Sequence, residues 1–160
     1  MRLGGRWGCA ALKKVVFACM HNAGRSHMAM AFFERLADPT KAIAICGGSQ
    51  PAPRIHPQVV GAMRELDVDL SRAAPTKLTS RMLHGAPLLV SLDWEGDPPS
   101  AGEARHVAWK LPVMKEVTRP HVRLMRDEIA RRVRHLIERE GWVRDWRQEI
   151  IRQSRMTAIS

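Results

Sequence analysis

The chain has 160 residues, of which 45% are apolar and 26% charged, a balance that is typical of one globular domain and argues against a disordered or membrane protein. No apolar run approaches the roughly 20 residues of a membrane span, so we expect a cytoplasmic protein without a membrane partner. The formal net charge of +10 favours anionic partners, but charge alone identifies none of them.

The first predicted strand and helix are separated by a short loop near the start of the chain. Residues 14–19 form an apolar run rich in β-forming side chains, and residues that favour a loop follow at 21–24. From Ser26 onward apolar residues recur at helical spacing, and Asp38-Pro39 ends the predicted helix. Cys19 therefore lies where a strand passes into a loop.

The middle of the chain repeats this alternation. Residues 42–46 predict a strand that ends at a pair of glycines, and residues 57–66 predict a helix with one apolar face. A short helical turn at residues 79–83 precedes a third, fully buried strand at residues 86–92. This alternation of strands and helices along the chain predicts strands that run parallel to one another.

The last third contains a brief strand and a long helix. The strand is predicted at residues 106–109, Thr118 is a suitable N-cap for the helix, and Gly141 is its predicted end. Residues 142–160 mix tryptophan and isoleucine with charged residues, which predicts a further helix docked on the domain.

Strands that alternate with helices predict a single-domain, three-layer α/β fold with a central four-stranded parallel sheet flanked by helices. In such folds ligands bind beyond the carboxyl ends of the strands, which is where Cys19 lies. We expect the domain to cover residues 14–141, between an N-terminal extension at residues 1–13 and a basic C-terminal extension at residues 142–160.

The loop after the first strand has the composition of an oxyanion site with a nucleophile at its start. Its backbone N–H groups can converge on one centre, and the next helix adds free N–H groups and the positive end of its dipole. Arg25 can bind two oxygens of one anion, while Ser26 can donate a hydrogen bond to the Cys19 thiolate that this positive field favours. The predicted oxyanion-binding residues are Met20, His21, Asn22, Ala23, Gly24 and Arg25.

The cysteines and histidines predict neither a disulfide framework nor a metal site. Cys9, Cys19 and Cys46 are odd in number and have no paired spacing. His21 and His27 flank the loop without a spaced partner that would complete a set of metal ligands. At least one cysteine is therefore expected to be a working thiol.

These motifs resemble the low-molecular-weight protein tyrosine phosphatases and, within that family, the arsenate reductases. The motifs of this chain that carry the resemblance are residues 15–19, 21–26 with 28–29, 48–52, 57, 62–63, 69–71, 109 with 111–112, and 126–129. It covers roughly residues 14 to 140, and the His-Asn-Ala-Gly-Arg-Ser loop is more similar to the reductase branch. The resemblance implies that Cys19 attacks arsenic or phosphorus while Arg25 and the loop amides hold the oxyanion, with Ser26 and Asn22 in support.

The chain departs from the family pattern at the position of the general acid. Val113 stands where relatives have the aspartate that donates a proton to the leaving oxygen. Loss of a general acid commonly costs about 10² to 10⁴-fold in rate, which makes phosphomonoester hydrolysis doubtful. The carboxylates of Asp93, Glu95, Asp97 and Glu116 are expected to be surface charges and not substitutes for it.

The second departure concerns the resolving cysteines that thioredoxin-linked relatives carry in the loop matching residues 92–99, since this chain has none there. Electrons would then come from an external thiol, namely glutathione, mycothiol or a redoxin, or from Cys46 or Cys9. Cys46 is the candidate second thiol, although its position at the end of a strand also fits a small buried core residue.

The leading hypothesis is therefore an arsenate reductase-like enzyme without a bound cofactor, with arsenate or phosphate as its ligand and a thiol-redox protein as a candidate partner. The alternatives are a low-molecular-weight protein tyrosine phosphatase and a non-catalytic protein that binds an oxyanion or a phosphoprotein. We do not expect a nucleic-acid partner, because the basic residues at 119–155 are interspersed with acidic ones and lack an aromatic stacking pattern.

Overall fold

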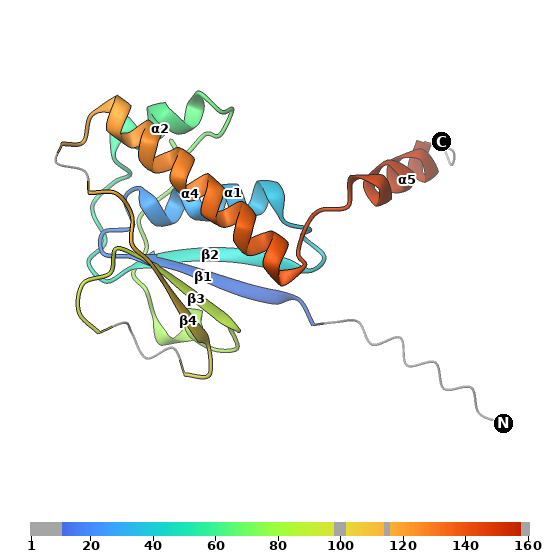
Figure 1. Ribbon diagram of the computed structural model, residues 1–160, viewed down its shortest axis with the longest axis horizontal. Coiled ribbons are helices and arrows are strands. Elements are labelled where there is room, and N and C mark those ends of the chain that lie inside the picture. Colours follow the sequence, from blue (N-terminus) through green and yellow to red (C-terminus); the bar gives the residue numbers. More distant parts are fainter. Residues whose placement is uncertain (1–10, 98–101, 114–115, 158–160) are drawn as a thin grey trace.

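The computed structural model describes residues 11–97, 102–113 and 116–157, and strands alternate with helices along them (Figure 1). The elements are β1 (Lys13–Cys19), α1 (Arg25–Leu36), β2 (Ala42–Gly48), α2 (Pro57–Arg64), α3 (Ser80–Leu83), β3 (Leu88–Leu92), β4 (Arg105–Trp109), α4 (Arg119–Glu140) and α5 (Trp146–Thr157).

The four strands form one parallel sheet in the order β2-β1-β3-β4. The strand order reverses beside β1, because β1 pairs with β2 on one side and with β3 on the other. In open parallel sheets a ligand crevice forms at such a reversal, outside the carboxyl ends of the strands. Cys19 is the last residue of β1, so the topology places it at this point.

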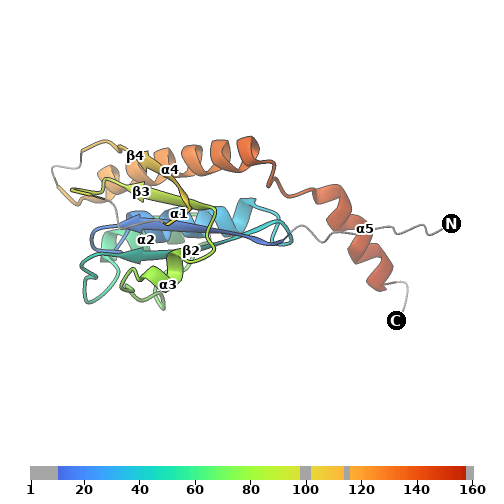
Figure 2. The same cartoon turned by 90° about the horizontal axis from the view of Figure 1, so that it is seen from below.

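The sheet is covered on both faces, as the alternation of side chains along β1 shows. Val15 and Phe17 belong to the larger core cluster, together with α1, α2 and α4, whereas Val16 belongs to a smaller cluster that includes α3. Figure 2 shows α3 on the opposite side of the sheet from α4. The ring of Phe17 packs between those of Phe33 and Trp109, with centroids 5.9 Å away in each case. The predicted three-layer fold is confirmed.

The main difference from the predicted elements is that β2 continues through the glycine pair to Gly48, which is the register partner of Cys19. A Cβ atom at Gly48 would lie 2.7 Å from the Met20 carbonyl oxygen and 2.9 Å from the Asn22 backbone nitrogen. Glycine is thus required there by the close approach of the loop and does not end the strand.

The described end of the chain has two parts. Gly141, at φ 72°, ends α4 as predicted, and the rings of Trp142 and Phe33 then pack with their centroids 5.9 Å apart. Beyond them α5 extends away from the sheet (Figures 1 and 2), which leaves Trp146 62% and Ile150 54% exposed. The helix was predicted, but its docking on the domain is not observed. Among the described helices none has the length and apolar content that crossing a bilayer requires.

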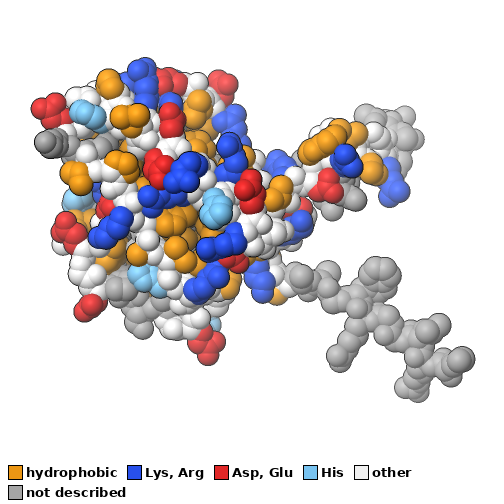
Figure 3. Space-filling model, viewed as in Figure 1, with side chains coloured by type: hydrophobic (Ala, Val, Ile, Leu, Met, Phe, Trp, Pro, Cys, Tyr) orange, Lys and Arg blue, Asp and Glu red, His pale blue; other side chains and the backbone are white. Residues whose placement is uncertain are grey.

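The outer face of α4 carries arginines interleaved with acidic and apolar side chains (Figure 3). Many of these arginines are paired, as in the contacts of Arg131 and Arg132 with Glu128 at 2.8 Å and 2.6 Å. This interleaving is the solvated helix face that the sequence predicted, while the absence of a nucleic-acid partner stays a prediction.

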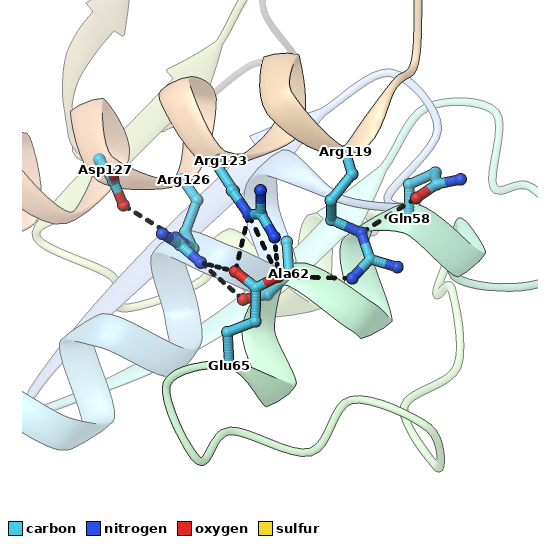
Figure 4. A network of polar contacts seen from close by, with 7 residues as sticks. All are labelled: Gln58, Ala62, Glu65, Arg119, Arg123, Arg126 and Asp127. Carbon is cyan, nitrogen blue, oxygen red and sulfur yellow. Dashed lines mark hydrogen bonds and ion pairs between the residues drawn. The ribbon is translucent and has the colours of Figure 1, made fainter.

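Glu65, just after α2, joins this helix to α4 (Figure 4). It accepts hydrogen bonds from Arg123 at 2.7 Å and from the nearly buried Arg126 at 2.9 Å, and Arg126 also donates to the Ala62 carbonyl at 2.8 Å. The hydrogen bond from Arg123, followed by that from Arg126, lowers the pKa of Glu65 to about 2. This network holds together the two helices that line one side of the pocket described next.

Candidate active site

The loop between β1 and α1 is shaped by the segment that runs beside it. The carbonyl oxygens of Met20, His21 and Ala23 accept hydrogen bonds from the backbone N–H groups of residues 50, 52 and 56, at 2.8, 2.9 and 2.9 Å. In a trans peptide unit the N–H points away from its carbonyl, so the N–H groups of His21, Asn22 and Gly24 point away from this segment, and that of Asn22 donates to the Cys19 sulfur. The first turn of α1 contains no acidic residue, so its dipole end stays positive.

Cys19, at the start of this loop, is buried, with 4% of the residue exposed. Its sulfur is 3.2 Å from the backbone nitrogen of Asn22, which donates to it, and 3.0 Å from the hydroxyl oxygen of Ser26. The structure therefore brings the predicted nucleophile and its predicted hydroxyl partner together.

Asn22 is completely buried and has φ of 47°, the left-handed region that asparagine tolerates better than most residues. Its side-chain oxygen accepts the backbone N–H of Thr76 at 2.8 Å, and its side-chain nitrogen is 2.7 Å from the Ser26 hydroxyl oxygen. These bonds tie the loop both to the start of α1 and to a segment 54 residues away. Asn22 thus braces the loop and is not an ordinary turn residue.

Asp93 lies beside the guanidinium of Arg25, a contact that the sequence did not predict. Arg25 Nε is 3.7 Å from Asp93 Oδ2, while Asp93 Oδ1 accepts the backbone N–H of Leu111 at 2.8 Å. Asp93 is therefore a contact of the site and of the segment after β4, and not a free surface charge. A signal was present in the sequence, because Asp93 directly follows a buried strand at the binding edge of a parallel sheet.

A pocket of about 140 Å³ opens above the sulfur. It is lined by Cys19, Arg25 and the loop between them. The other lining residues come from α1, from α2 and the residue before it, and from α4 and the segment before it. The wall residues, none of which the sequence predicted, are Met28, His56, Val59, Val117 and Val122. The lining thus combines the loop and Arg25 with mostly apolar side chains from the surrounding helices.

No carboxylate lines this pocket among the residues that the structure describes. Val113, where the resemblance predicted the loss of a general acid, is 90% exposed and is not among the residues that line the pocket. His56 is at the wall, but its Nδ1 accepts the backbone N–H of Gln58 at 3.2 Å as the cap of α2. The geometry therefore offers an oxyanion site and a nucleophile without a carboxylic acid beside the leaving group.

Cys46 lies behind the loop, where its sulfur accepts a hydrogen bond from the side-chain nitrogen of Asn22 at 3.2 Å. Burial raises the pKa of Cys46 to about 11, so its thiolate is scarce at neutral pH. Cys9 lies outside the described residues. Within the described residues no group of three histidine, cysteine, aspartate or glutamate side chains has an arrangement that could hold a metal ion.

Comparison with known proteins places these features in a wider group. Residues 14–138 match the family described as low molecular weight phosphotyrosine protein phosphatase. A Halobacterium salinarum protein assigned as an arsenate reductase is 30% identical over 131 residues, which are 78% of this chain and 91% of that protein. The glutaredoxin arsenate reductase of Synechocystis is 37% identical over 60 residues, 38% of this chain and 44% of that protein.

Among solved structures, the thioredoxin-dependent arsenate reductase of Corynebacterium glutamicum superposes with a TM-score of 0.69 at 27% identity. The superposition covers 81% of this chain and 62% of that one, so this chain spans less than two thirds of that relative.

Proposed function

Since the chain belongs to the low molecular weight phosphotyrosine protein phosphatase family, we propose that it reduces arsenate by thiolate attack, with an external thiol as the electron donor. The observation that supports this proposal is that Cys19, Arg25 and the loop between them line one pocket, with the Asn22 N–H donating to the Cys19 sulfur. Relatives named as arsenate reductases favour arsenate over a phosphate ester as the substrate.

In the proposed first step the loop N–H groups, the N-terminus of α1 and the Arg25 guanidinium bind arsenate. Asp93 contributes by holding the Arg25 side chain over the pocket. The anion is then placed directly above a sulfur that receives two hydrogen bonds, so attack needs little rearrangement.

In the second step the Cys19 thiolate attacks the arsenic of the arsenate monoanion. A sulfur–arsenic bond forms, and one arsenate hydroxyl leaves as water after it takes the proton carried by another oxygen of the same substrate. Arsenate can thus supply its own proton, whereas the bridging oxygen of a phosphomonoester needs an acid from the protein. The lack of a carboxylate in the pocket lining, among the described residues, therefore supports the reductase over the phosphatase.

In the third step an external thiol attacks the sulfur of Cys19. The sulfur–arsenic bond breaks, its electron pair reduces arsenic from the pentavalent to the trivalent state, and arsenite leaves after proton uptake. A mixed disulfide forms between Cys19 and the external thiol, and a second equivalent of that thiol regenerates Cys19. Burial raises the pKa of Cys46 to about 11 and so disfavours its thiolate, and we therefore assign this step to glutathione, mycothiol or a redoxin.

The test is arsenite production by the purified protein with arsenate and, separately, glutathione with glutaredoxin, mycothiol with a mycoredoxin, or thioredoxin with its reductase. We expect one thiol system to support turnover and Cys19→Ser to abolish it. Release of p-nitrophenol from p-nitrophenyl phosphate without any thiol would indicate the phosphatase instead. Arsenate binding without turnover in any thiol system would indicate a non-catalytic oxyanion-binding protein, and either result would contradict the proposal.

A further inference from the structure

The side-chain amide of Asn22 can have only one orientation in this structure. Its oxygen lies 2.8 Å from the backbone nitrogen of Thr76, and a backbone N–H can only donate. The amide nitrogen must therefore be the atom that faces Ser26 and Cys46, at 2.7 Å and 3.2 Å, and its two hydrogens go to these two acceptors. One backbone group outside the loop thus decides how the whole amide points.

This orientation also decides where the hydrogen of Ser26 goes. The Ser26 hydroxyl oxygen accepts a hydrogen from Asn22, so its own hydrogen is left for the Cys19 sulfur at 3.0 Å. Cys19 then receives two donors, the Ser26 hydroxyl and the Asn22 backbone N–H. The number of hydrogens that reach the nucleophile therefore depends on the orientation of the Asn22 side chain.

His27 completes this chain of hydrogen bonds from the first turn of α1. Its Nε2 is 3.0 Å from the Asn22 side-chain oxygen, and because an amide oxygen only accepts, Nε2 must carry the hydrogen. Its Nδ1 is buried and has no hydrogen-bond partner in the described part of the chain. A proton on Nδ1 would place an unpaired charge in the interior, and burial accordingly lowers the pKa of His27. The imidazole is therefore neutral, in a single tautomer.

A buried nitrogen that lacks a partner among the described residues carries a free-energy cost, so its presence on a ring that contacts Asn22 calls for an explanation. We propose that His27 is a positioning residue, whose neutral imidazole donates Nε2–H to Asn22 and so holds the hydrogen-bond chain that ends on the Cys19 sulfur. The proposal rests on the proposed function only in taking Cys19 as the nucleophile. Ser26 and His27 are neighbours on one helical turn, which supports the two ends of this chain on one rigid element.

The expected effect is moderate, because Thr76 still holds the Asn22 oxygen when His27 is replaced. Loss of one hydrogen bond between uncharged groups corresponds to about a two- to tenfold change in an equilibrium. In His27→Leu the alkylation rate of Cys19 at neutral pH should fall by about this factor, and the midpoint of its pH profile should move upward. In His27→Gln, whose amide can donate to the same oxygen, the rate should stay within about twofold of the original.

The experiment measures iodoacetamide modification of the Cys19 peptide by mass spectrometry across a pH series, with His84→Leu as a control at an exposed histidine. Thermal unfolding curves establish that each variant is folded. A folded His27→Leu protein with the original profile would overturn the proposal, as would equal losses in the Leu and Gln variants. Because no arsenate is used, the result does not depend on whether the protein reduces arsenate.

A second measurement needs no substitution and keeps the inference testable if His27→Leu does not fold. In the ¹⁵N-labelled protein the two ring nitrogens of a neutral histidine have different chemical shifts, which identify the tautomer. We expect the Nε2–H tautomer for His27, with no change to the imidazolium in mildly acidic buffer. Observation of the Nδ1–H tautomer or of a charged ring at neutral pH would refute the assignment.

Discussion

Replacing Asp93 by asparagine would separate the two contacts of this carboxylate. An asparagine keeps one oxygen for the Leu111 N–H, now 2.8 Å from Oδ1, and replaces Oδ2, the atom 3.7 Å from Arg25 Nε, by an NH₂ group that cannot accept. Asparagine also tolerates the backbone φ of 46° at this position. The Arg25 contact is thus removed while the anchor of the segment after β4 is kept.

The contribution of this ion pair to stability should be small. The side chains of Arg25 and Asp93 are 34% and 24% exposed, so solvent screens the pair to about 0.2 to 1 kcal/mol. The larger effect is expected on anion binding, because the freed guanidinium of Arg25 can turn to solvent. Loss of hydrogen bonds to a charged group costs about 1.5 to 3 kcal/mol, and since Arg25 is still present we expect the lower end, about a tenfold loss of oxyanion affinity.

The assay for Asp93→Asn is the protection of Cys19 from iodoacetamide by arsenate or phosphate, together with kcat/KM for arsenate reduction. The phosphate concentration for half-protection should rise by about tenfold, and kcat/KM should fall in proportion. Removing a negative charge beside the anion site acts in the opposite direction, so the sign of the change is informative. Unchanged or tighter anion binding would show that Asp93 does not orient Arg25.

Three further predictions concern the thiol, the loop and the helix pair. Cys46→Ser should keep arsenate reduction within about twofold, because serine can accept the same bond from Asn22, whereas loss of turnover would identify Cys46 as the resolving thiol. Gly48→Ala should lower turnover at least about tenfold and reduce Tm, because the added Cβ would meet backbone atoms of the loop. A fully active variant whose crystal structure shows an unchanged loop would contradict this. Glu65→Gln should lower Tm at neutral pH. The folded-state pKa of about 2 lies below the ordinary value, so this contribution is present above about pH 4.5 and lost as pH falls toward 2, and the difference in Tm between the two proteins should shrink in acid.

Local sequence was sufficient for the elements and for the central loop. Strand and helix periodicities depend on neighbouring residues only, and the apolar run before Cys19 and the helical spacing after Ser26 are both intact in the structure. The anion site at the loop could be predicted from the same periodicities, because the free backbone N–H groups at the start of a helix face the loop that leads into it. Gly141 ends α4 for a similarly local reason, since it adopts the left-handed conformation.

Tertiary structure decided which distant residues surround this loop. Asp93 and Arg25 are far apart in sequence and meet only because β3 pairs with β1 and carries its carboxyl end to the same edge of the sheet. The N–H of Thr76 orients the Asn22 side chain, whose oxygen also accepts the hydrogen bond from His27. Nothing in the local sequence around Thr76 indicates this role. Sequence periodicity determines which face of an element is buried, but contacts between elements depend on strand order, register and side-chain rotamers, which arise only when the chain packs.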